Sequence, residues 1–179
     1  MSDAGPSRIL EIPPEKLTPE QQAGIEAVVG GRGRLLTPYK VWIHSPQLMR
    51  ALETLGTFLN KKGSLSEREV ELGIVLTAHH WHGAYVQAAH VKRLRELGVS
   101  EPVLDALKRG AAPDLTDARD RAIYDLFKTI EAPGGGSDEV FERASKVLGR
   151  NGLAEALALF GYYSAVAIAM KLHRVPIPA

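Results

Sequence analysis

The 179-residue chain contains no cysteine, which excludes disulfide bonds, thiolate metal ligands and cysteine nucleophiles. It also lacks an excess of charge, because 22 Lys and Arg residues are balanced by 21 Asp and Glu residues and leave a formal net charge of +1. Domains that bind nucleic acids normally carry a basic surface, so we expect no nucleic-acid partner. The absence of cysteine fits a cytoplasmic location, which is our expectation.

Long apolar runs are also missing. The longest apolar stretch, residues 156–170, is uncharged but shorter than the about 20 residues that a helix needs to span a bilayer. The first residues of the chain are polar and contain proline, without the apolar stretch of a signal peptide. We therefore expect no membrane association, and we interpret the uncharged run as part of a buried helix.

The sequence predicts an all-α fold. No segment shows the sustained period-two alternation that is typical of strands. Helix-start signals recur instead, and two of them, at residues 18–21 and 66–69, have the sequence of a capping box. We predict a bundle of about seven helices in a single domain over residues 17–179, preceded by an extended arm at residues 1–16.

Several boundaries follow from local signals. The first helix should end at Gly30-Gly31, the helical region 67–97 should bend at Gly83, and a later helix should be capped by Thr116. The last helix, from Asn151 to about residue 173, is almost free of charge. A helix without a solvated face is buried on every side, so we place it in the centre of the bundle or at a subunit interface, and we expect a homo-oligomer.

Two polar residues occupy apolar helix faces. Glu71 shares a face with Ile74 and Val75, and His90 shares one with Val86 and Leu94. A buried carboxylate is costly without a partner, and a bend at Gly83 would let the two side chains meet. A Glu–His pair serves proton transfer, with the carboxylate orienting the imidazole. The same pair also fits a satisfied polar contact in the core without a catalytic role.

The region between these two residues is rich in histidine. A metal site is conceivable because His79 and His82 are three residues apart, but the pattern lacks His-Glu-x-x-His and a third ligand at fixed spacing. We therefore expect no functional metal. Trp81 and Tyr85, four residues apart, fit either one wall of a pocket or ordinary aromatic packing.

The sequence around these residues resembles the carboxymuconolactone decarboxylase family, which includes the alkylhydroperoxidase D-like proteins. The resemblance rests on segment 68–75, Arg-Glu-Val-Glu-Leu-Gly-Ile-Val, on His80-Trp81 and Tyr85, and on His90. Segments 41–46 and 161–163 resemble longer members of the family. The resemblance implies an alkylhydroperoxidase D-like helical bundle.

The chain departs from the peroxidase branch of this family, which uses a Cys-x-x-Cys between the corresponding glutamate and histidine. Aligned on Glu71 and His90, the two cysteine positions fall at Gly83 and Val86, so thiol peroxidase chemistry is excluded. Many longer relatives carry an acidic residue at the second of these positions, where this chain has valine.

The resemblance therefore implies a cofactor-free lyase, such as a decarboxylase, or an isomerase that acts on a small carboxylated or lactone substrate. The candidate catalytic residues are His90 and Glu71, and the candidate substrate pocket is formed by His80, Trp81, His82 and Tyr85. One alternative is a non-catalytic oligomeric protein that binds a small molecule. The other is a metal-dependent enzyme that uses His79, His80, His82 and His90.

Overall fold

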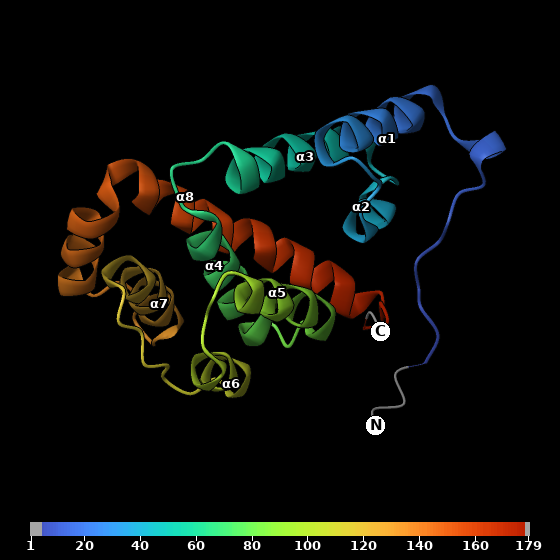
Figure 1. The fold of residues 1–179 in the computed structure, drawn as a ribbon. Coiled ribbons are helices and arrows are strands. Elements are labelled where there is room, and N and C mark those ends of the chain that lie inside the picture. Colours follow the sequence, from blue (N-terminus) through green and yellow to red (C-terminus); the bar gives the residue numbers. More distant parts are fainter. Residues whose placement is uncertain (1–4, 178–179) are drawn as a thin grey trace.

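The computed structural model describes residues 5–177, and these residues form eight α-helices and one 3-10 turn without a strand (Figure 1). The predicted all-α class is therefore confirmed. Of the predicted arm, residues 1–4 lie outside the described residues, 5–13 contain no helix, and Pro14–Lys16 form the 3-10 turn. The helices are α1 (Pro19–Arg32), α2 (Thr37–Trp42), α3 (Pro46–Lys61), α4 (Glu67–His80), α5 (Ala84–Glu96), α6 (Glu101–Arg109), α7 (Ala118–Glu131) and α8 (Asp138–Leu172).

Both predicted capping boxes are formed, at Thr18 and at Ser66. The predicted end of the first helix is wrong, because α1 continues through Gly30-Gly31 to Arg32 and is followed by Gly33 in the left-handed conformation with φ 77°. The glycine at position 31 is explained by packing. A Cβ atom there would collide with the carboxylate of Glu53 in α3.

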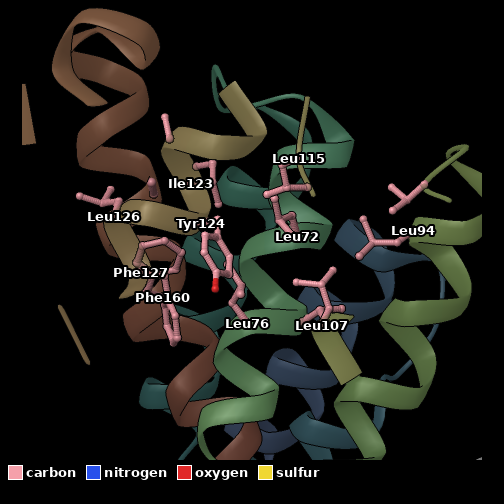
Figure 2. Packing of buried hydrophobic residues seen from close by; sticks show 14 of the residues in the cluster. Leu72, Leu76, Leu94, Leu107, Leu115, Ile123, Tyr124, Leu126, Phe127 and Phe160 are labelled. Carbon is pink, nitrogen blue, oxygen red and sulfur yellow. The ribbon is translucent and has the colours of Figure 1, made fainter. Parts of the chain in front are cut away.

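Helices α4 and α8 form the centre of the molecule, with the other helices around them (Figure 1). Both helices contribute residues to each of two clusters of buried apolar residues. In the first cluster, Leu72 and Leu76 of α4 pack with α5, α6, α7 and the start of α8. Figure 2 shows this cluster, in which Phe127 of α7 lies edge-on to Phe160 of α8 with ring centroids 5.0 Å apart. In the second cluster, Ile74 of α4 packs with α1, α2, α3 and the later part of α8.

Helix α8 differs from the expectation that it is buried on every side. It is kinked at Gly149, where φ is 73°, close to the predicted boundary between two helices. It has the length and hydropathy of a membrane-spanning helix, yet half of its most apolar segment is buried inside the fold. Beyond the kink one face stays exposed, and we call its seven residues the α8 stripe: Ala154, Leu157, Ala158, Gly161, Ala165, Ile168 and Leu172.

The N-cap of α7 is Asp117 rather than the predicted Thr116. The Asp117 carboxylate accepts hydrogen bonds from the backbone N–H groups of Arg119 and Asp120, at 2.8 and 3.0 Å. These bonds, with that from Asp120 contributing most, lower the pKa of Asp117. A carboxyl group whose pKa is lower in the folded than in the unfolded chain stabilises the fold above its unfolded pKa of about 4, and this contribution is lost as the pH falls.

We expect the Asp117→Ala substitution to lower the free energy of unfolding by about 1 kcal/mol at pH 7. The difference from the wild type should shrink as the pH falls below about 4, because the wild-type carboxylate becomes protonated. Urea unfolding at neutral and acidic pH measures both values. Asp117→Asn is the control, since its amide oxygen caps the helix without titrating. An alanine variant whose cost is the same at both pH values would contradict this account.

Candidate active site

Glu71 and His90 are brought together by the turn between α4 and α5. The turn ends at Gly83, the N-cap of α5, as the predicted bend requires. The Nδ1 atom of His90 lies 2.6 Å from Oε2 of Glu71. Glu71 is 8% exposed, whereas the His90 side chain keeps 25% of its surface accessible. The pair is therefore anchored in the interior and open on the histidine side.

This geometry fixes the proton positions on the imidazole. An ionised carboxylate only accepts hydrogen bonds, so Nδ1 of His90 donates to Glu71. The remaining nitrogen, Nε2, is then free to accept a proton when the ring is neutral and to donate one when it is charged. An imidazole held in this way is suited to general acid–base chemistry.

Tyr163 of α8 packs on the histidine. The two ring centroids are 5.7 Å apart at an interplanar angle of 79°. The Tyr163 hydroxyl donates a hydrogen bond of 2.9 Å to Oδ1 of Asn60 in α3. Burial raises the pKa of Tyr163, so the phenol stays protonated. The contact with Tyr163 limits rotation of the imidazole, and Asn60 in turn holds the tyrosine in place.

A buried polar cluster lies beyond Tyr163, between α1, α2, α3 and α8. In it, Nε of Arg32 donates to Oε2 of Glu53 at 3.2 Å, and their side chains are only 10% and 7% exposed. The hydroxyls of Tyr39 and Tyr162 are 3.2 Å apart, and burial raises the pKa of both phenols. Gly56 is required here, since a Cβ atom would collide with the Tyr162 hydroxyl.

Sequence reasoning did not identify this cluster. The available signal was in α3, where Glu53 shares a helix face with Met49, Gly56 and Asn60. A carboxylate on that face needs a buried partner. Nothing in the local sequence, however, indicates that the partner is Arg32 at the end of α1.

Two of the residues predicted to line the substrate pocket have other surroundings. Nδ1 of His80 lies 2.7 Å from Oε1 of Glu131 in α7. The Trp81 indole N–H donates a hydrogen bond of 2.8 Å to the hydroxyl of Ser164 in α8. Both contacts join α4 to its neighbours on the side of α7 and α8.

The other two predicted pocket residues lie together. His82 and Tyr85 line a cavity of about 590 Å³ at the ends of α4 and α8. His90 is not part of its wall. The Tyr85 hydroxyl also donates a hydrogen bond of 3.0 Å to Thr37 at the start of α2.

The histidines do not converge on one point. His80 pairs with Glu131 and His90 with Glu71, while the rings of His79 and His82 are 6.5 Å apart. Over residues 5–177, no group of three or more His, Asp or Glu side chains is arranged to hold a metal ion.

The central part of the sequence matches a known family model. Residues 46–129 match the model of the carboxymuconolactone decarboxylase family, and this range contains both Glu71 and His90. This segment, 84 of the 179 residues, belongs to the carboxymuconolactone decarboxylase family. It is a member without cysteine, so the family's thiol chemistry is excluded for it.

Solved structures show how the family fold extends over the whole chain. An uncharacterised peroxidase-related protein from Ralstonia eutropha JMP134, with an alkylhydroperoxidase AhpD core, is 20% identical, with a TM-score of 0.74 over 97% of this chain and 94% of that one. An uncharacterised peroxidase-related protein from Silicibacter sp. TM1040 is 18% identical, with a TM-score of 0.73 over 100% and 96%. The fold is therefore AhpD-like.

A third similar structure contains a ligand. It is a cysteine-to-alanine variant of the debrominase Bmp8 in complex with 2,3,4-tribromopyrrole, which is 12% identical to this chain, with a TM-score of 0.70 over 99% of this chain and 95% of that one. Among curated proteins, none matches the sequence. These structures thus show the fold of the chain.

Proposed function

We propose that this protein is a cofactor-free lyase or isomerase that acts on a small carboxylated or lactone substrate, with His90 as the general acid–base. The observation that carries the proposal is the 2.6 Å contact between His90 and Glu71, in which the histidine alone remains accessible. The absence of cysteine removes the thiol reactions of the family, and proton transfer is what the remaining pair is able to do.

In the proposed decarboxylation one C–C bond of the substrate is broken and His90 supplies one proton. The substrate carboxylate leaves as CO2, and the electron pair of the broken C–C bond is delocalised into the lactone system. The imidazolium of His90 then donates its Nε2 proton to the substrate carbon, and the ring regains a proton from water. Glu71 holds the ring through Nδ1 at each stage and does not touch the substrate, so its role is to position the histidine.

The direct test is turnover of carboxymuconolactone by the wild-type protein after treatment with a metal chelator. Loss of the lactone with release of CO2 would support a cofactor-free decarboxylase. Activity that disappears with the chelator and returns with a divalent metal would favour the metal-dependent alternative. Specific binding of the lactone without turnover would favour a binding protein that has kept the fold.

We also propose that the protein forms a homo-oligomer in which a second copy covers the α8 stripe. All seven exposed residues of the stripe are apolar, and none carries a charge. Two copies of this face therefore pack without repulsion between like charges, as a two-fold symmetric interface requires. The small residues Ala158, Gly161 and Ala165 let two helices approach closely, with Leu157 and Ile168 at the sides.

We expect Gly161→Glu to convert the oligomer into a folded monomer. A Cβ atom at Gly161 meets no other atom within 4 Å, so the substitution leaves the subunit intact while it places a charge in the proposed interface. Gly30→Glu is the matched control, since Gly30 is an equally open and exposed helical glycine on α1. Light scattering of both variants gives the subunit number. A wild-type monomer at micromolar concentration, or an unchanged Gly161→Glu oligomer, would contradict the proposal.

A further inference from the structure

The cavity that contains His82 and Tyr85 lies where three parts of the chain meet. These are the turn between α4 and α5, the end of α8, and the N-terminal arm, which is attached to α8 by a hydrogen bond of 2.8 Å from the Arg8 N–H to the carbonyl of His173. Its volume of about 590 Å³ is within the usual range for small-molecule sites. His90 is not part of its wall, which contains two of the predicted pocket residues, His82 and Tyr85.

Both charged side chains in this wall are basic. Lys171 and Arg174 line the cavity together with His82, and no described residue of the wall carries a carboxylate. Within residues 5–177, neither Lys171 nor Arg174 forms an ion pair. The first turn of α5 adds to the positive potential, because its N-cap is Gly83, which has no side chain to accept the first N–H groups. A cavity with this electrostatic character attracts an anion.

The rest of the wall is largely apolar. Met170, Val175, Pro176 and Ile177 contribute one side, and Tyr85 contributes another. Inorganic anions gain nothing from such a surface, whereas an organic anion buries its hydrocarbon part against it. The wall therefore fits a ligand with one charged end and an apolar body.

Two of the basic residues are held in an unfavourable backbone conformation. His82 (φ 51°) and Arg174 (φ 52°) are the two non-glycine residues with positive φ in the described part of the chain. Each directly follows the C-cap of a helix, α4 or α8, at the position where glycine is preferred. Glycine would fit better at both positions, so both basic side chains are kept at a cost in stability.

We propose that this cavity binds a small organic monocarboxylate. Arg174 and Lys171 hold the carboxylate, and the hydrocarbon body lies against Val175 and Pro176. This site does not depend on the reaction proposed for His90, and the protein is expected to bind the carboxylate whether or not it decarboxylates a lactone.

Benzoate is a suitable probe, with benzamide as its uncharged analogue and inorganic phosphate as an anion without an apolar body. Isothermal titration calorimetry of the full chain at low salt should show benzoate binding about tenfold or more tightly than either control, because a charge-assisted hydrogen bond and the apolar contact are both required. Equal affinity for benzoate and benzamide, equal affinity for benzoate and phosphate, or no binding of millimolar benzoate would overturn the proposal.

The Arg174→Gly variant separates binding from stability. It should weaken benzoate about tenfold or more and at the same time raise the melting temperature of the free protein by about 2–4 °C, since glycine relieves the positive φ. Arg34→Gly removes the same charge from an exposed position elsewhere and should leave benzoate affinity unchanged. Equal affinity in the Arg174→Gly variant and the wild type would overturn the role of Arg174, and weakening by Arg34→Gly would show that only overall charge matters.

Discussion

Replacing His90 by alanine is expected to lower turnover of the lactone by about 10²- to 10⁴-fold, the usual contribution of a positioned general acid or base. The variant should still fold, because the imidazole is partly exposed, but with a lower free energy of unfolding, because the nearly buried Glu71 loses its partner. Steady-state kinetics with circular dichroism of the same samples measures both effects. Full activity in this variant would remove His90 from the mechanism.

Two further variants make this test specific. Glu71→Gln keeps a hydrogen-bond acceptor for Nδ1 of His90 and removes the negative charge, so it should lower kcat and shift the pH profile while leaving KM nearly unchanged. His44→Ala removes an exposed histidine that contacts the carbonyl of Leu10 and should have wild-type kinetics. A Glu71→Gln profile identical to that of the wild type would mean that the carboxylate has only a structural role.

The second large effect is expected in the buried polar cluster. Glu53→Ala removes the partner of Arg32 and leaves a guanidinium that is almost fully buried, so the free energy of unfolding should fall by about 3–5 kcal/mol. The loss includes the hydrogen bond that Thr57 donates to Glu53. Chemical denaturation gives the value directly.

A double variant tests whether the unpaired charge of Arg32 causes this loss of stability. Arg32→Met combined with Glu53→Leu replaces both charged groups by apolar ones of similar size, and such replacements of buried ion pairs are often neutral or stabilising. We expect the double variant to be clearly more stable than Glu53→Ala alone. A double variant that is no more stable would indicate that the cost comes from lost packing around Tyr39 and Tyr162 instead.

The sequence was sufficient to predict the features that depend on local signals. Capping boxes marked the starts of α1 and α4, and Gly83 marked the turn that brings Glu71 to His90. Apolar spacing identified both members of the pair, because each lies on a helix face that is otherwise buried.

The features that it did not predict depend on contacts between distant segments. Helix α2 has only six residues and no side-chain cap, so it is too short for a periodic pattern, and it is held by the packing of Tyr39 and Trp42. Gly31 does not end α1, because this glycine leaves room for the carboxylate of Glu53 in α3. The different surroundings of His80 and Trp81 likewise depend on where Glu131 and Ser164 lie in the folded chain.

The shared position of α4 and α8 between the two apolar clusters has a consequence for the motions of the protein. Neither cluster can open without exposing one side of these two helices, so the two halves of the molecule should unfold together rather than in separate steps. The amide protons of Ile74, Val75 and Leu159, which are fully buried, should therefore exchange with solvent only through global unfolding. Glu71 lies on α4, in this slowest-exchanging part of the molecule. Partial openings of the outer helices should therefore leave the geometry of the His90–Glu71 contact unchanged.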